Sequence, residues 1–396
     1  MTPRRAPLLL IAPIAATLLL GGCETLRSWM PSIPAPSWNW TSWFSSSKKP
    51  GPLPETKASA SAQLVWQLSV GKATPGFAPA VVGDAIYAAA QDGTIVRVDA
   101  ANGRTAWRVS AGKKLSAGAG ADATLVAVGT DKGEVLAFDT NGKPLWQAKV
   151  SSEVVSPPRV ADGLVVVASG DGRLYGLTAA DGKTKWVYQR NNPPLTVRNY
   201  AGAAASRGGL FIGVAGGKLL ALDLPTGSMA WEGNVATPKG ATELERIADV
   251  TSLPVVAERQ ACAVAFQGRV ACFELTRGNL NWSRDVSSLE GMAVDARNLY
   301  VTDDKGAIHA LDHSTGASVW KQDKLAQRKP GGPQIVGGEL GVVDIEGYLH
   351  LIDRNDGSLV GRAATDGAPA TSQPALAGAN AVWQSSGGTL YAFTAR

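Results

Sequence analysis

The feature that most constrains the fold is a pattern of about 40 residues that recurs from residue 63 to the C-terminus. Each copy has an apolar run, an Asp-Gly type turn, a second run ending in Asp, a glycine turn and a short run with tryptophan. Three copies show the pattern clearly: DGTIVRVDAANGRTAW at 92–107, DGRLYGLTAADGKTKW at 171–186 and DKGAIHALDHSTGASVW at 304–320. The anchor tryptophans are Trp66, Trp107, Trp146, Trp186, Trp231, Trp282 and Trp320, and an eighth copy places Val360 in the tryptophan position. A period near 40 residues held over eight anchors predicts a propeller or a solenoid.

The two ends of the repeat region decide between these architectures. Each copy supplies four short strands, which make one propeller blade. Residues 63–70 match only the last strand of a blade, whereas residues 372–396 supply the first three strands and then stop. Each end completes the other, and closing the ring in this way removes an exposed sheet edge. We therefore predict an all-β fold: an eight-bladed β-propeller of four-stranded blades, closed by pairing the N-terminal strand with the C-terminal blade.

The residues before the repeats are typical of an exported lipoprotein. Arg4 and Arg5 precede an apolar stretch from Leu8 to Leu20, and small residues lead up to Cys23, as in a secretion signal. The sequence LGGC at 20–23 resembles a bacterial lipobox, in which the cysteine is lipidated and becomes the first mature residue. Glu24 follows, rather than the aspartate associated with inner-membrane retention. We expect residues 1–22 to be removed and the chain to be lipid-anchored at Cys23 to the outer membrane, facing the periplasm.

Three segments follow from this division of the chain. Residues 1–22 are the predicted signal peptide, residues 23–62 a flexible linker rich in Trp, Pro and Ser, and residues 63–396 the propeller. The linker tryptophans either lie at the membrane interface or are an incidental part of a partly collapsed linker.

The formal net charge is +5 and would be +3 without Arg4 and Arg5, which gives no case for nucleic-acid binding.

Two anchor intervals, of 45 and 51 residues, are longer than the others and mark insertions at 187–199 and 232–250. They belong to consecutive blades, so we expect them side by side on one face, where insertions in repeat proteins often form the binding surface. The first segment carries Arg190 and Arg198 with apolar Leu195 and Val197. The second carries Glu243, Glu245, Arg246 and Asp249. Apolar residues beside guanidinium groups suit a protein-binding surface.

Residues suited to catalysis are scarce. Of the histidines, His309 and His350 fall in a repeat position that is otherwise apolar or aromatic, which predicts a packing role, and His313 falls in a turn, where we expect it to be solvated. An aspartate recurs at the end of the third strand in five blades and is interpreted as a turn cap rather than an acid or base (Asp99, Asp139, Asp223, Asp312 and Asp353). We predict no catalytic residue, no metal site and no cofactor.

Cys262 and Cys272 flank the hairpin sequence CAVAFQGRVAC. They could face each other across two strands and form a disulfide in an oxidising periplasm. Cys272 also aligns with Ala137, Gly176 and Ala221, a position for small residues, so two buried thiols fit as well.

These residues resemble the BamB family, lipoproteins of the outer-membrane β-barrel assembly machinery. The resemblance covers the lipobox and all eight blades, and its most specific motifs are PPLTVRNYAG at 193–202, ATELERIADVTSLPVV at 241–256 and EGYLHLID at 346–353. It implies a scaffold without enzymatic activity that docks on the periplasmic POTRA domains of a BamA-like insertase, alongside other Bam lipoproteins and unfolded outer-membrane protein precursors.

Carried over by motif, the implied contacts are Leu195, Val197 and Arg198 in the first segment and Asp249 in the second. Thr251 stands where enteric members are expected to have a further acidic residue, which puts that contact in doubt here. Glu243 and Arg246 complete the predicted partner-binding set on the spacing argument.

Two other functions remain open from the sequence. Pyrroloquinoline-quinone-dependent dehydrogenases use a similar eight-bladed ring, but they are usually much longer and hold quinone and calcium at the channel. The vicinal cysteines found in many alcohol dehydrogenases of that class are absent here. A periplasmic propeller that binds a cell-wall or carbohydrate ligand is the other alternative.

Overall fold

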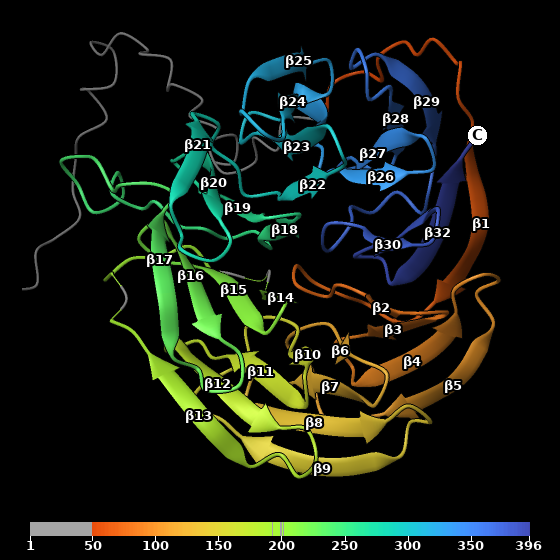
Figure 1. Cartoon of the computed structure of the whole chain (residues 1–396). Helices are drawn as coiled ribbons and strands as arrows, with labels where there is room; N and C mark the ends of the chain where they lie inside the picture. Colours follow the sequence, from red (N-terminus) through yellow and green to blue (C-terminus); the bar gives the residue numbers. More distant parts are fainter. Residues whose placement is uncertain (1–49, 192, 199, 201) are drawn as a thin grey trace, which may run out of the picture. The chain divides into compact units, whose positions relative to one another are not determined.

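The computed structural model describes residues 50–191, 193–198, 200 and 202–396. The predicted signal peptide, Cys23 and residues 24–49 of the predicted linker lie outside the described residues. Over the described part the strands form eight four-stranded antiparallel sheets arranged in a ring, which confirms the predicted eight-bladed propeller (Figure 1). No helix in this part is long and apolar enough to cross a membrane.

Each blade runs from an innermost to an outermost strand. Blades 1 to 4 consist of β2 (Ala80–Val82), β3 (Ala85–Ala89), β4 (Thr94–Asp99) and β5 (Thr105–Ser110); β6 (Gly120–Ala121), β7 (Leu125–Gly129), β8 (Glu134–Asp139) and β9 (Pro144–Lys149); β10 (Arg159–Ala161), β11 (Leu164–Ala168), β12 (Arg173–Thr178) and β13 (Thr184–Gln189); β14 (Ala203–Ser206), β15 (Gly209–Val214), β16 (Lys218–Asp223) and β17 (Met229–Asn234). Blades 5 to 7 consist of β18 (Val255–Ala257), β19 (Gln260–Val264), β20 (Val270–Glu274) and β21 (Leu280–Arg284); β22 (Met292–Val294), β23 (Asn298–Thr302), β24 (Ile308–Asp312) and β25 (Ser318–Gln322); β26 (Gln334–Val336), β27 (Glu339–Val343), β28 (Leu349–Ile352) and β29 (Leu359–Ala363). Blade 8 consists of β30 (Ala375–Ala377), β31 (Asn380–Gln384), β32 (Thr389–Ala395) and β1 (Ala62–Ser69), and a single 3-10 turn, η1 (Ala326–Arg328), precedes blade 7.

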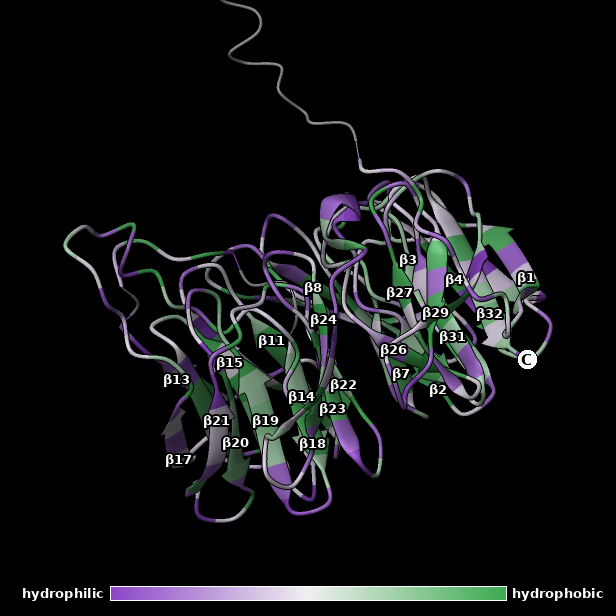
Figure 2. Cartoon of the chain, turned by 90° about the horizontal axis from the view of Figure 1, so that it is seen from above, coloured by the Kyte–Doolittle hydropathy of each residue, from purple (hydrophilic) through white to green (hydrophobic). Residues whose placement is uncertain are grey.

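The hydrophobic core lies between the blades rather than at the centre of the ring. A typical apolar cluster joins residues of blade 2, such as Leu125, to residues of blade 3, such as Val165 and Val167. Because a second strand is covered by neighbouring blades on both faces, every residue of β3 and of β7 is buried. An outer strand such as β5 alternates between exposed and half-buried positions instead. The apolar strands inside each blade and the polar connections at the rims are visible in Figure 2.

In every blade except blade 7, a repeat tryptophan bonds to the next blade. Trp146, in blade 2, donates its indole N–H to the carbonyl of Ala179 in blade 3 over 2.8 Å. Its ring lies against Gly182, where a Cβ would come within 2.5 Å of the indole and where φ is +71°. The glycine is therefore required both by the turn and by the indole that rests on it. The same indole-to-carbonyl bond is made by Trp66, Trp107, Trp186, Trp231, Trp282 and Trp320. These indoles therefore lie in the seams between neighbouring blades.

Blade 8 closes the ring in the predicted way. β1 pairs antiparallel with β32, from Ala62 opposite Ala395 to Ser69 opposite Thr389. Ser61 and Arg396 exchange backbone hydrogen bonds of 2.7 and 3.1 Å at the end of this pair, where other blades have a covalent turn. The two chain segments are therefore held together without a connecting loop.

The eighth tryptophan position is held by Gly361 rather than by Val360, so that prediction was one residue out. In blade 6, Trp320 pairs with Ala310 just before a bulge, and the residue at the same register in blade 7 is Gly361, opposite Leu351. A Cβ at Gly361 would come within 2.4 Å of the Ala60 carbonyl oxygen. Blade 8 has no third-to-fourth strand turn to receive an indole, and the incoming N-terminal chain occupies the space.

Residues 50–61, here named the N-terminal strap, run along blade 7. The sequence placed them in the linker, but their backbone is bonded to the ring. Lys57 and Ala60 donate N–H bonds to the carbonyls of Leu359 and Val360, over 2.9 and 3.0 Å. Arg362 reaches the Pro54 carbonyl over 3.1 Å. Arg328 donates to the Gly51 carbonyl over 2.5 Å.

Candidate functional site

The two long connections predicted from the sequence leave the same face of the ring. The first loop, residues 190–202, joins β13 to β14, and the second loop, residues 235–254, joins β17 to β18. Each leads from an outer strand to the innermost strand of the next blade, so both lie at the face where all such connections run. In Figure 1 the second loop, drawn in green, reaches outward past the ends of β17 and β21. We call the surface formed by these two loops the two-loop face.

Asp249 lies beneath this face and joins its parts. Its side chain is only 2% exposed. One carboxylate oxygen accepts the N–H of Val197 in the first loop over 2.6 Å, and the other accepts the N–H of Gly216 in the β15–β16 hairpin over 2.8 Å. These bonds satisfy a buried carboxylate and fix the first loop against the second. The structure therefore places Asp249 below the surface, where it positions the two loops instead of presenting its side chain to solvent.

A cavity of about 320 Å³ lies between blades 3 and 4 under the first loop. Its lining includes the apolar side chains of Val155, Leu174 and Ile212 and the guanidinium groups of Arg173, Arg190 and Arg198. An apolar lining with a few convergent polar groups is typical of a recognition pocket.

Each of these arginines already holds one carboxylate. Arg173 contacts Asp171 at 2.6 Å, Arg190 contacts Glu232 at 2.6 Å, and Arg198 contacts Glu153 at 3.3 Å. A guanidinium has five N–H donors, so these pairs leave donors for a further acceptor.

The carboxylate partner of Arg190 is held in its charged form. Partial burial alone would raise the pKa of Glu232, but Lys218 and Arg190 outweigh it and hold that pKa below its usual value. Glu232 therefore stays ionised and holds Arg190 at the cavity.

The tip of the second loop is a compact turn. The carboxylate of Glu245 accepts the N–H groups of Ala241 and Thr242 over 2.7 and 3.1 Å. These two N–H groups, with Thr242 contributing most, hold the pKa of Glu245 below its usual value. Arg246 donates to the Gly240 carbonyl over 3.0 Å and contacts the Glu243 carboxylate at 3.2 Å.

The predicted partner-binding residues thus fall into different settings. Leu195 is 44% exposed, Arg198 is exposed and stacks over the Tyr200 ring at 5.4 Å, and Val197 is half-buried in the cavity lining. Glu243 and Arg246 are exposed but paired with each other. Thr251, the position where the resemblance was in doubt, is 8% exposed, and its hydroxyl has no partner among the described residues.

Two features of the face were not predicted from the sequence. Glu153, in the connection between β9 and β10, and Arg173, on β12, line the cavity from repeat positions whose spacing is ordinary, so no length signal marks them. Leu244 projects from the tip turn and is 68% exposed. An apolar residue inside the charged run TELER is the one sequence signal that could have singled it out.

The repeated carboxylates, His309 and His350 make hydrogen bonds that stabilise local structure. The repeated carboxylates accept N–H groups of the turns that follow them, which confirms their prediction as turn caps (Asp99, Asp139, Asp223, Asp312 and Asp353). His309 bonds Asp303 at 2.9 Å and His350 bonds Asp344 at 2.8 Å. Within the described ranges, no group of three or more His, Cys, Asp or Glu residues could hold a metal ion.

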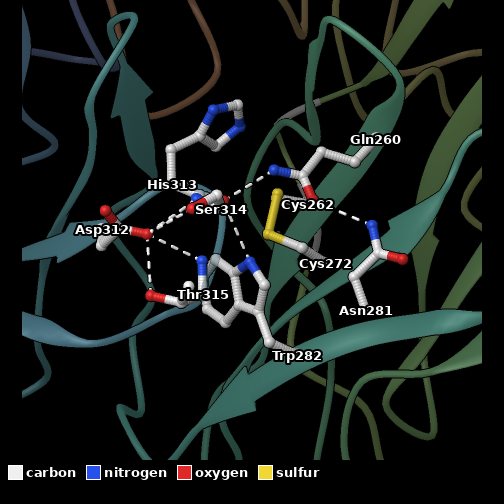
Figure 3. The surroundings of a disulfide bond; sticks show 9 residues. All are labelled: Gln260, Cys262, Cys272, Asn281, Trp282, Asp312, His313, Ser314 and Thr315. Atoms are coloured by element: carbon white, nitrogen blue, oxygen red, sulfur yellow. Dashed lines mark hydrogen bonds between the residues drawn. A yellow bond between two sulfur atoms is a disulfide. The ribbon is translucent and has the colours of Figure 1, made fainter.

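His313 differs from its prediction as a solvated turn residue, because it is only 4% exposed (Figure 3). Its carbonyl is the acceptor for both Trp282, at 3.0 Å, and Gln260, at 2.7 Å. The residue is held in the seam between blades 5 and 6, and the imidazole is buried with it.

A disulfide joins Cys262 to Cys272 across the paired strands β19 and β20 (Figure 3). Both residues are fully buried. Cys272 also lies opposite Trp282, the register at which Ala137 and Gly176 face their own tryptophans. The position holds small residues because an indole covers it, which agrees with the repeat alignment. In this blade the small residue is a cysteine that also forms the disulfide.

Comparison with known proteins identifies the family. A model of the family described as outer membrane protein assembly factor BamB matches residues 91–322. A protein of that name from Nitrosomonas eutropha is 42% identical over 96% of this chain and 93% of its own length. The chain belongs to the BamB family. The BamB protein of Bordetella pertussis is likewise 42% identical, over 86% of this chain and 89% of its own.

Solved structures agree on the fold. The BamB crystal structure from Moraxella catarrhalis matches with a TM-score of 0.77 at 24% identity, over 84% of this chain and 99% of that one. The quinohemoprotein alcohol dehydrogenase of Comamonas testosteroni matches with a TM-score of 0.66 at 13% identity, over 84% of this chain and 76% of that one. The second match extends the shared ring to an enzyme, and at this identity it concerns the fold alone.

Proposed function

We propose that this protein is a non-catalytic assembly factor for outer-membrane proteins, which docks through its two-loop face on the periplasmic POTRA domains of a BamA-like barrel insertase. Other Bam lipoproteins and unfolded barrel precursors are its further proposed partners. Membership of the BamB family supports the assembly role, since its relatives carry the name of outer membrane protein assembly factors.

The observation that carries the docking proposal is the buried Asp249 carboxylate, which locks two insertions of adjacent blades into one surface. Long loops are normally mobile, and ordering them on binding would cost affinity. A surface ordered in advance avoids that cost. Exposed Leu195 and Arg198 lie on the loop that Asp249 holds.

The cavity under the first loop indicates the chemistry of the partner's contact. Its apolar lining suits one apolar or aromatic side chain, and the spare guanidinium donors at its edge suit an acidic group or a strand carbonyl beside it. We therefore expect the partner to present an apolar side chain flanked by hydrogen-bond acceptors.

The test is an affinity pull-down of the tagged full-length lipoprotein from outer membranes solubilised in mild detergent, with retained proteins identified by mass. Wild type is compared with Leu195→Glu and Arg198→Glu, and with Leu145→Glu on β9 as a control of similar exposure away from the loops. We expect a POTRA-bearing barrel protein with wild type and the control, and its loss with both loop variants. Its absence with wild type would refute the docking role, and its retention by all variants would place the interface elsewhere.

We also propose that Cys23 is lipidated and anchors the chain in the outer membrane, on the periplasmic side. The LGGC motif and the absence of an aspartate at position 24 support this. Mass analysis of the mature N-terminus should find a diacylated or triacylated Cys23. A mature protein that begins at any other residue would contradict the anchor.

A further inference from the structure

The second loop exposes one apolar side chain, that of Leu244, to solvent at the tip of a turn that is stabilised by its own hydrogen bonds. Leu244 is 68% exposed, the highest exposure among the large exposed apolar side chains of the described residues. Exposed apolar residues on their own are ordinary. Leu244 differs from the others because of the structure that supports it.

The turn at residues 240–247 is fixed by bonds among its own members. Besides the Glu245 and Arg246 bonds described above, the Arg246 N–H bonds the Thr242 carbonyl at 3.2 Å, and the Ile247 N–H bonds the Leu244 carbonyl at 3.4 Å. At its C-terminal end the loop becomes buried at Ala248, and Asp249 ties it to its neighbours. The leucine is therefore carried on a turn whose shape does not depend on a partner.

The charges around Leu244 are already compensated. Glu243 is paired with Arg246, and Glu245 is bonded to two backbone N–H groups. Burying the tip against another protein would leave no charge of this turn without a partner, which makes its desolvation less costly than that of unpaired charges. The tip is suited to enter an apolar socket that offers no charges of its own.

We propose that Leu244 is a specificity-determining anchor that inserts into an apolar socket on the periplasmic domains of the same insertase. This rests on the proposed function. The two-loop face then makes two complementary contacts: the cavity under the first loop receives a side chain, and the tip of the second loop supplies one. Two such contacts on loops fixed by Asp249 accept only a partner that has both features at the right separation.

The experiment measures the affinity of the full-length lipoprotein for the intact, detergent-solubilised insertase on a biosensor surface. Leu244→Ala should raise Kd by about tenfold or more, as truncation of a buried anchor does. Leu244→Met should retain most of the affinity, because the tip stays apolar and similar in volume. Leu280→Ala on β21, at 49% exposure, is the matched control and should stay within about twofold of wild type.

One outcome would overturn the docking role and the anchor with it, and a different outcome would overturn the anchor alone. If wild type does not bind the insertase at all, the proposed function is wrong. If wild type binds and Leu244→Ala binds equally well, docking stands and the anchor is wrong. A Glu245→Ala variant, which keeps the leucine and loosens its turn, should also weaken binding. If that variant binds the insertase as tightly as wild type, the preformed turn does not contribute to the affinity and this part of the proposal is wrong.

Discussion

At the scale of single residues, Asp249 shows how one buried side chain organises a surface. The resemblance to the family implied that this aspartate is itself a contact, but its carboxylate is bonded to two backbone N–H groups below the face. A variant that fails to dock because of Asp249 would therefore fail through the loops it positions. Nothing in the local sequence reveals this, since burial depends on where the β15–β16 hairpin lies.

Asp249→Ala should leave the N–H groups of Val197 and Gly216 without acceptors. We expect the variant to lose about 2–3 kcal/mol of unfolding free energy in urea, as for a buried hydrogen-bonded group. Hydrogen exchange should become faster at both amides. Asp223→Ala, which removes an exposed turn cap in blade 4, should cost less than half as much. Equal losses of unfolding free energy in the two variants would mean that Asp249 stabilises the two-loop face no more than an ordinary turn cap stabilises its turn.

Asp344 is a second buried carboxylate, and it makes stability depend on pH. It contacts Arg328 at 2.5 Å and His350 at 2.8 Å. Burial alone would raise the pKa of Asp344, but the bonds from His350 and Arg328 outweigh it, and the net result is a lowered pKa. A carboxyl group whose folded pKa is lowered stabilises the protein above its unfolded pKa of about 4, and this contribution is lost as the pH falls through the folded pKa.

Asp344→Asn should therefore be destabilised most near neutral pH, by about 3–5 kcal/mol, because it leaves the buried Arg328 without this counter-charge. The difference from wild type should shrink steadily once the pH falls below about 4. Urea unfolding of both proteins between pH 7 and pH 3 measures it. A difference that stays constant over this range would contradict the assigned role.

At the scale of elements, the N-terminal strap takes the place of a repeat tryptophan. Its sequence contains three prolines and two serines and has no strand-like alternation, so composition predicted a linker. The repeat phase predicted the strands well, because each blade needs the same turns and the same indole. It could not predict the strap, whose place becomes clear only once Gly361 is seen opposite Leu351, with the chain ends meeting beside it.

Gly361→Ala tests whether the strap fills this position. The new Cβ would meet the Ala60 carbonyl at 2.4 Å, so the strap must move. We expect a loss of about 1–3 kcal/mol, typical of overpacking, and faster hydrogen exchange at Lys57 and Ala60. Gly338→Ala is the control, since a Cβ there meets nothing within 4 Å. Unchanged exchange in the strap of Gly361→Ala would show that the strap is not seated on β29.

At the scale of the whole molecule, the ring depends on one strand that no turn connects to its blade. Every other outer strand follows its neighbour through a short turn, which keeps it close even when its contacts weaken. β1 is joined to β32 only by pairing and packing, with the whole ring between them in sequence. Losing β1 would expose a blade edge and open the ring, so contacts of β1 should matter more than the same contacts elsewhere.

Trp66 and Trp320 allow this comparison, because they are 7% and 8% exposed and bond the next blade over 3.0 and 2.9 Å. Replacing either by alanine should cost about 3–5 kcal/mol through the cavity and the lost bond. Trp66→Ala should lower Tm further and make β1 sensitive to protease, since the released strand is not retained by a turn. Trp320→Ala should lower Tm without releasing a terminal fragment. Equal shifts in Tm with equal protection of β1 would mean that ring closure adds nothing beyond the packing of one indole.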